Sequence, residues 1–335
     1  MEFRASYTTV EAHTGGEPLR IVTGGVPRLP GETILEKRRW VREHLDHVRR
    51  ALILEPRGHA DMYGALLTEP VSERADLGVL FMHNEGYSDM CGHGVIALAM
   101  VAVAQGLVPR TSPETRVGLD TPAGFVEAFV VWDGRTAGEV RFRNVASFLH
   151  TRDLTVTTPS FGPVTVDVAF GGAFYAYLEA ADVGLRVEPG QLRALIQAGD
   201  EIKHAVMAAK GVVHPLEPEL RGIYGTILAG PPADAANHQR NVCIFAEREV
   251  DRSPTGTGTS GRVAQLVARG RLGLGEPLRN ESIVGSVFTA TALERTRVGP
   301  YDAVVPEVTG RAAITGFATW LVESGDGLGE GFYLR

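Results

Sequence analysis

The chain has only two cysteines among 335 residues, which excludes a framework of structural disulfides. Its ten histidines show no His-x-x-x-His spacing, and no Cys-x-x-Cys pair occurs. Such spacings bring ligands together around a metal ion, so we expect no bound metal. The scarcity of cysteine and the lack of any sign of export favour a reducing cytoplasm.

The chain also lacks a net positive charge and long apolar runs. The formal net charge is −7, which argues against nucleic acid or a polybasic membrane contact as a partner. Arg and Glu interrupt every apolar run before it reaches the roughly 20 residues that span a membrane. The first residues do not show the basic-then-apolar layout of a signal peptide. We therefore expect a cytoplasmic globular protein that binds neither nucleic acid nor membrane.

One short pattern occurs twice, about half of the chain apart. It begins at Cys91 in the first copy and at Thr255 in the second. Each of these residues is followed by Gly at the next and third positions, by a later Val-Ala pair, and by a Gly that ends the pattern, Gly106 or Gly270. This spacing predicts a duplicated domain that presents two chemical groups to one central site. A thiol can ionise near neutral pH and a threonine hydroxyl cannot, so the two groups are chemically unequal.

Helices are expected at a few places along the chain. The run 95–104 is apolar on all sides, which is typical of a helix buried inside a domain, and 261–269 mirrors it. Apolar residues at helical spacing predict another helix over 34–52. Two more are expected at 191–198 and 201–209.

Strands fill most of the remaining sequence. The predicted strands cover residues 3–10, 17–23, 62–67, 77–82, 125–132, 139–142, 164–170, 173–177, 221–228, 241–245, 286–291 and 312–319. The pattern favours an α+β fold of two pseudo-symmetric domains, each with strands wrapped around a central helix and with the active site in the cleft between them. We place the first domain at 1–125 and the second at 126–321, with the tail 322–335 packing back on the first.

The repeated pattern also predicts the chemistry of the site. Cys91 would lie at or just before a helix N-terminus, where free backbone N–H groups and the helix dipole favour a thiolate. The flanking glycines would let a small carboxylate approach those N–H groups. His93 could orient or stabilise the thiolate, or only satisfy the helix start. Cys243 lies in an apolar, strand-like run and is expected to be a core residue.

The glycine run Gly256-Thr257-Gly258-Thr259-Ser260-Gly261 matches the G-x-G-x-x-G pattern of dinucleotide-binding proteins. An NAD(P)-dependent oxidoreductase is therefore an alternative of a different class. The context is poor for it, because Pro254 and its neighbours separate the run from the preceding strand, and no βαβ unit surrounds it.

Four longer blocks carry a resemblance to a known family. They are residues 13–20, 55–59, 83–93 and 251–260, and they occur in the family's order over most of the chain. On these blocks the chain resembles the proline racemase superfamily. The resemblance implies a fold like that of diaminopimelate epimerase and cofactor-independent chemistry at the α-carbon of a proline-type imino acid, with a homodimer as one possible assembly.

Racemases and epimerases of this family use two cysteines, one on each face of the substrate. This chain has Cys91 at the first position but Thr255 at the second, so inversion by two bases should be crippled. The pair instead resembles the family members that dehydrate trans-3-hydroxy-L-proline to Δ1-pyrroline-2-carboxylate, a hydro-lyase reaction. In that substrate the α-hydrogen and the hydroxyl lie on the same ring face, so a single thiolate could remove the proton and return it to the departing oxygen.

The same resemblance implies roles for the remaining site residues. The amides of Gly92, His93, Gly256 and Thr257 would hold the substrate carboxylate as charge develops on it. The family pattern implies that Asp251 pairs with the ring ammonium, although it could instead cap a loop.

Several points stay open. Thr255 would bond the substrate or only fill space. The rival within the family is a proline racemase or 4-hydroxyproline 2-epimerase that uses Thr255 at the second position. His59, His83 and Asp89 match the family blocks without an assigned role.

Overall fold

The structure is a computed structural model that describes residues 2–334, and it divides into two compact units. The first contains the described residues up to Val140 together with those from Arg311 onward, and the second runs from Arg141 to Gly310. The sequence placed the divisions near residues 125 and 321. The strand at 124–132 pairs with the strand before it, and the strand that starts at Ala312 pairs with the N-terminal strand, so both stay in the first unit. The domain bounds themselves stay a prediction.

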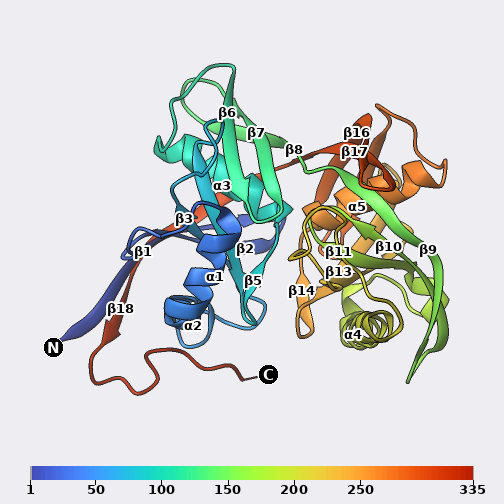
Figure 1. Cartoon of the computed structure of the whole chain (residues 1–335), viewed down its shortest axis with the longest axis horizontal. Coiled ribbons are helices and arrows are strands. Elements are labelled where there is room, and N and C mark those ends of the chain that lie inside the picture. Colours follow the sequence, from blue (N-terminus) through green and yellow to red (C-terminus); the bar gives the residue numbers. More distant parts are fainter. Residues whose placement is uncertain (1, 335) are drawn as a thin grey trace. The chain divides into compact units, whose positions relative to one another are not determined.

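The first unit is built on strands that pair in the order β18-β1-β2-β3-β4-β6-β7, with β5 added to β4. The strands are β1 (Phe3–Thr14), β2 (Glu17–Gly24), β3 (Tyr63–Thr68), β4 (Leu77–His83), β5 (Tyr87–Ser88), β6 (Glu114–Thr121), β7 (Gly124–Trp132) and β18 (Ala312–Glu323). Helix α3 (Gly92–Gln105) contacts β1, β2, β3, β6, β7 and β18, and its Gly94 also faces Phe81 of β4. Figure 1 shows α3 among these strands. Its residues from Gly92 to Val103 are all buried, as the apolar run predicted.

The second unit contains strands whose ladders close into a ring, in the order β9-β10-β11-β12-β13-β15-β16-β17 and back to β9. They are β9 (Ser147–Thr158), β10 (Gly162–Phe170), β11 (Phe174–Glu179), β12 (Gly225–Gly230), β13 (Gln239–Phe245), β15 (Pro277–Ser282), β16 (Val287–Val298) and β17 (Tyr301–Gly310), with β14 (Glu249–Asp251) added to β13. Helix α5 (Gly256–Ala268) contacts β9, β10, β11, β16 and β17 (Figure 1). Its residues from Gly256 to Val267 are buried. Strand β8 (Ala137–Arg143) contains the point where the units divide.

The remaining helices correct two sequence predictions. The expected helix at 34–52 is two helices, α1 (Ile34–His44) and α2 (Asp46–Ile53), because Leu45 leaves the helical conformation at φ −127° and ψ 15°. The two helices expected between 191 and 209 are instead one, α4 (Leu192–Ala209). Short 3₁₀ helices cover Ala180–Val183 and Pro189–Gln191. Within residues 2–334, no helix combines the length and the apolar character needed to cross a membrane.

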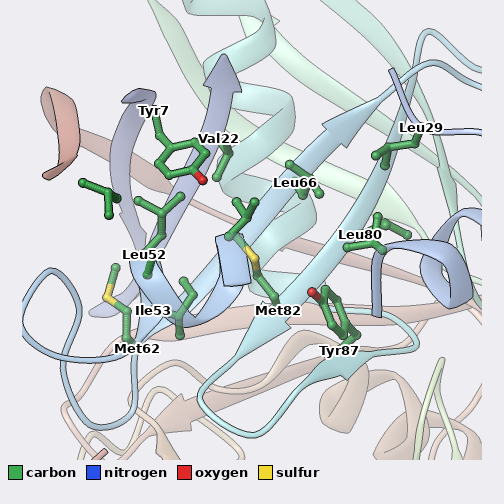
Figure 2. Packing of buried hydrophobic residues seen from close by; sticks show 14 of the residues in the cluster. Tyr7, Val22, Leu29, Leu52, Ile53, Met62, Leu66, Leu80, Met82 and Tyr87 are labelled. Carbon is green, nitrogen blue, oxygen red and sulfur yellow. The ribbon is translucent and has the colours of Figure 1, made fainter. Parts of the chain in front are cut away.

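Helices α1 and α2 close the core of the first unit on the side of β3 and β4. Figure 2 shows side chains of this cluster from β1, β2, β3, β4 and α2. Leu52 and Ile53 of α2 have no exposed surface and pack in one cluster with Leu66 and Met82. Burying such a side chain stabilises the fold by roughly 1.5–3 kcal/mol.

The glycines that end the two sequence patterns have the same conformation. Gly106 has φ +71° and is the C-cap of α3, and Gly270 has φ +68° two residues after α5 ends. A left-handed residue is a common way to end a helix, and glycine adopts it without a Cβ clash. The repeated pattern therefore corresponds to two helices that begin at the same pattern position, and α5 ends one position earlier in the pattern than α3.

Candidate functional site in two half-sites

Cys91 is the N-cap residue of α3, as the sequence predicted. Its backbone is extended, with φ −141° and ψ 110°, and its sulfur accepts a hydrogen bond from the N–H of Gly94 at 3.2 Å. The residue is 4% exposed. The first-turn amides of a helix have no partner within the helix, so the sulfur occupies a position where negative charge is stabilised.

The ring of His93 lies directly beside the sulfur. Its Nδ1 is 3.2 Å from Sγ of Cys91, and its Nε2 is 3.7 Å away. The Tyr63 ring packs edge-on against the His93 ring at 4.9 Å between centroids, and Thr14 Oγ1 donates to the His93 carbonyl at 2.9 Å. The sequence pointed to His93 but not to Tyr63 or Thr14, which come from β3 and β1 and meet it only in the folded chain.

Gly94 leaves the space that the sulfur needs. A Cβ at this position would lie 2.5 Å from Cε1 of Phe81 and 3.0 Å from Sγ of Cys91. Gly92 is buried in the same turn. Packing against Phe81 and the Cys91 sulfur thus requires a glycine at position 94, in addition to the predicted access for a carboxylate.

Thr255 is the N-cap residue of α5, the position that corresponds to Cys91 in the second unit. It differs from Cys91 in two ways. Its backbone has φ +62° and ψ 97°, and its side chain makes no capping hydrogen bond. A Cβ on Gly258 would lie 2.9 Å from the Thr255 methyl carbon Cγ2, so the methyl group faces Gly258. The hydroxyl Oγ1 is buried, and no partner for it is found among residues 2–334.

Asp251 is buried at the end of β14 and is 5% exposed. Its Oδ1 accepts a hydrogen bond from the N–H of Ser253 at 2.8 Å, and Ser253 Oγ in turn accepts from the N–H of Thr255 at 3.1 Å. Oδ1 of Asp251 therefore caps this loop, and substrate binding by Asp251 stays a prediction. The loop it caps is the one that carries Thr255.

Two tyrosines of β11 hold the first turns of α5. Tyr175 OH is 2.7 Å from Thr257 Oγ1, and Tyr177 OH donates to the Gly258 carbonyl at 2.9 Å. Burial raises the pKa of both phenols well above the usual range, so both hydroxyls stay protonated. The sequence placed a strand here but did not indicate either tyrosine.

The glycine run has a packing role that differs from nucleotide binding. All of its residues from Gly256 to Gly261 lie inside α5, and a Cβ on Gly261 would be 2.1 Å from the Tyr177 hydroxyl. The preceding strand, β14, pairs antiparallel with β13, so the run does not follow a strand of a parallel βαβ unit. This arrangement argues against the oxidoreductase alternative.

The unassigned motif residues hold loops of the first unit. Asp89 forms an ion pair with Arg38. His83 Nδ1 accepts from the N–H of Glu85 at 3.3 Å, and His59 is exposed with its Nδ1 2.7 Å from the Ala60 carbonyl.

Two further observations concern possible metal ligands and the second cysteine. Asp200, His204 and Glu247 have ligand atoms within 4.8 Å of one another, a grouping that the sequence spacing did not indicate. Asp200 already forms an ion pair with Arg248 at 2.9 Å, and its Oδ1 lies 3.3 Å from His204 Nδ1. Cys243 is a buried core residue on β13, as predicted.

Known proteins similar to this chain identify its family. A sequence profile described as proline racemase matches residues 9–333. A trans-3-hydroxy-L-proline dehydratase from Burkholderia cenocepacia is 59% identical over 335 residues, which covers 100% of both chains. A 3-hydroxyproline 2-epimerase from Burkholderia multivorans is 59% identical, and a trans-3-hydroxy-L-proline dehydratase from Azospirillum brasilense is 58% identical, each also over 100% of both chains.

A solved structure shows the same fold. It is the crystal structure of a hydroxyproline epimerase from Agrobacterium vitis with bound trans-4-OH-L-proline, with a TM-score of 0.93 and 32% identity. The match covers 100% of this chain and 97% of that chain. The chain therefore has the proline racemase-like fold and belongs to the proline racemase family.

Proposed function

We propose that this protein is a trans-3-hydroxy-L-proline dehydratase, a hydro-lyase that forms Δ1-pyrroline-2-carboxylate without a cofactor. Relatives with this name match it over their full length at 58–59% identity. The observation that carries the proposal is the unequal pair of N-cap residues. Cys91 has two hydrogen-bonding groups at its sulfur, whereas Thr255 offers a buried hydroxyl that cannot ionise near neutral pH.

Cys91 is the base in this mechanism. Its thiolate, stabilised by the Gly94 N–H and the His93 ring, removes the α-proton and becomes a thiol. The electron pair of the broken C–H bond forms a double bond between C2 and C3, and the C3–O bond breaks. The thiol proton passes to the departing oxygen on the same ring face, which releases water and regenerates the thiolate. The resulting enamine becomes the cyclic imine when its N–H proton moves to C3.

The helix N-termini hold the substrate carboxylate in this proposal. The amides of Gly92 and His93, and those of Gly256 and Thr257, are first-turn groups of α3 and α5. Negative charge spreads onto the carboxylate as the α-proton leaves, so donors fixed in place lower the barrier. This arrangement requires the two pseudo-symmetric domains to enclose the substrate in a cleft between them.

Thr255 and Asp251 complete the proposed site. The buried Thr255 hydroxyl bonds the substrate or its hydroxyl group, because an unsatisfied buried hydroxyl is costly unless a ligand uses it. Asp251 Oδ1 is committed to the Ser253 N–H, so an interaction with the ring ammonium falls to Oδ2. A small imino acid is the partner, and the cytoplasmic location and the homodimer stay predictions from the sequence.

One relative favours a second candidate. The 59% identical protein from Burkholderia multivorans is named 3-hydroxyproline 2-epimerase. Epimerisation needs a proton donor on the opposite ring face, and the Thr255 hydroxyl would have to supply or relay that proton. A hydroxyl is a poor acid and base near neutral pH, so dehydration is the better supported function.

The test is incubation of the purified protein with trans-3-hydroxy-L-proline, without added cofactor, followed by an assay for the cyclic imine. The same assay on trans-4-hydroxy-L-proline and on a Cys91→Ser variant serves as control. We expect imine from the 3-hydroxy substrate alone and its loss in the variant. Epimer formation without imine would establish the second candidate instead.

A further inference from the structure

We infer that a buried hydrogen-bond chain, running from Arg262 through Gln239 and Asn280 to the carbonyl of Pro254, is a positioning device for Thr255. The inference extends the proposed function, because it assumes that the Thr255 hydroxyl contacts the substrate. All residues of the chain belong to the second unit.

The backbone of Thr255 is strained. A φ of +62° is uncommon for any residue with a Cβ, and most unfavourable for a β-branched one. The other non-glycine residues with positive φ are Asp61, Asp153, Ala246 and Arg248, none of them β-branched. Such a conformation costs roughly 1–3 kcal/mol and persists only where the surroundings determine it.

Both peptide planes next to Thr255 are held by hydrogen bonds, and the plane before it is held from two sides. In the plane before it, the Pro254 carbonyl accepts from Asn241 Nδ2 at 3.0 Å, Asn280 Nδ2 at 3.1 Å and Thr259 Oγ1 at 2.9 Å. On the opposite side of that plane, the N–H of Thr255 donates to Ser253 Oγ. In the plane after it, the Thr255 carbonyl accepts the Thr259 N–H at 2.7 Å. These contacts set φ and ψ, and therefore the direction of the side chain.

The orientation of each amide in the chain follows from Arg262. A guanidinium only donates, so its Nε, 2.9 Å from Gln239, must face the oxygen Oε1. Gln239 then presents Nε2 to Asn280 Oδ1 at 3.0 Å. Asn280 is left with Nδ2 toward the Pro254 carbonyl and toward Thr259 Oγ1 at 2.8 Å. Arg262 only donates and the Pro254 carbonyl only accepts, so the two ends of the chain require the same orientation of Gln239 and Asn280.

Cys91, which corresponds to Thr255 in the first unit, is held in a different way. Cys91 has a relaxed backbone, and its sulfur is held directly by the Gly94 N–H. Thr255 lacks a capping bond from its own side chain, so its hydroxyl is aimed by the backbone alone. Burial keeps water from competing at the Pro254 carbonyl, since its donors Asn280 and Asn241 are 0% and 1% exposed.

The test is Gln239→Glu, which keeps the size of the side chain and an acceptor for Arg262 but removes the donor to Asn280. Asn280 then has an acceptor at both ends, the carboxylate of residue 239 and the Pro254 carbonyl, so its amide can satisfy only one of them. Gln239 and Arg262 line a surface cavity of about 420 Å³, so the new carboxylate stays near water. The matched control is Glu179→Gln, which removes an ion-pair partner of Arg262 but leaves its bond to Gln239 intact. Asn241→Ala removes a different donor to the same carbonyl and serves if Gln239→Glu does not fold.

We expect Gln239→Glu to lower kcat/KM for trans-3-hydroxy-L-proline by roughly 10-fold or more, mainly through kcat, since small misplacements near a reacting group have effects of this size. The Glu179→Gln variant should stay within about 2-fold of wild type, because the bond from Arg262 Nε to Gln239 Oε1 is kept. In a Thr255→Val background, Gln239→Glu should cause little further loss, because residues that act as one unit are not additive. Losses that multiply would overturn the inference.

A crystal structure of Gln239→Glu provides a readout that does not depend on activity. If the wild-type protein forms no imine, the proposed function fails, and the backbone angle still decides the positioning role. We expect φ of Thr255 to leave the region near +62°. A Thr255 that keeps this angle in the variant would show that the chain does not position it.

Discussion

The sulfur of Cys91 lies 3.2 Å from Nδ1 of His93, at the first turn of a helix that is buried on all sides. The Gly94 N–H donates to the same sulfur, also at 3.2 Å. Tyr63 and Thr14 fix the position of His93. A thiolate formed at this place therefore has a backbone donor and a ring nitrogen beside it, on a rigid support.

The first prediction concerns His93. Replacing it by Ala removes the ring beside the sulfur and should lower kcat by roughly 10- to 100-fold, the range typical of a lost hydrogen bond to a charged group. The rise of activity with pH should also move to higher pH, because the thiolate loses a stabilising neighbour. The pH dependence of imine formation measures both effects. An unchanged profile would mean that His93 only supports the helix start.

Thr255→Val should separate activity from stability. Valine has nearly the shape of threonine and the same backbone strain at φ +62°, so the substitution removes only the unsatisfied hydroxyl. We expect the free energy of unfolding to rise by about 1 kcal/mol or stay equal, while kcat/KM falls. Urea denaturation and steady-state kinetics measure the two quantities. Thr255→Ser keeps the hydroxyl and is the control; a stable, fully active valine variant would assign Thr255 to packing alone.

Gly94→Ala should damage both the fold and the site. Its new Cβ would meet Phe81 at 2.5 Å and the Cys91 sulfur at 3.0 Å, so α3 or the sulfur must shift. Overpacking of this kind costs about 1–3 kcal/mol of unfolding free energy. Gly86→Ala is the matched control, because a Cβ there meets nothing within 4 Å. Thermal unfolding and the imine assay should distinguish the two variants, and equal behaviour would contradict the packing role of Gly94.

Two half-buried histidines, His150 and His214, should make the stability of the fold depend on pH. Burial lowers the pKa of His150, with a smaller contribution from Lys210, and burial also lowers the pKa of His214 below the ordinary 6.5. Both pack against aromatic rings of the second unit. The unfolded chain binds their protons at a higher pH than the folded chain does, so stability is complete above about pH 6.5 and falls as the pH drops through it.

The measurement is urea denaturation between pH 7.5 and 5.5 for wild type and for the double variant His150→Gln, His214→Gln. We expect the double variant to show a shallower fall in unfolding free energy than wild type. His59→Gln, a change at an exposed position, should reproduce the wild-type slope. Equal slopes for all three proteins would assign the acid sensitivity to other groups.

The sequence pattern predicted a helix best where the helix is buried on all sides. The apolar run after Cys91 and the terminal Gly106 indicated a buried helix and its end, and α3 follows both. The continuous pattern over 34–52 did not reveal the break at Leu45, because helical spacing continues through it. Strands β5, β6, β9, β14, β15 and β17 were not predicted. Three of them, β6, β9 and β17, pair with a neighbour in sequence and also with a distant strand, as Ala303 does with Phe148, and no local pattern encodes the distant pairing.

The sequence by itself determined the family, the repeated pattern and the chemical inequality of Cys91 and Thr255, because these depend on residue identity and spacing. Only the tertiary structure decided how each group is held. Tyr63 and Thr14 reach His93 from other strands, and the strained angle at Thr255 depends on amides contributed by β13 and β15. A backbone angle that local preference disfavours exists only because distant groups hold it, and distances between such groups are not encoded in any short stretch of sequence.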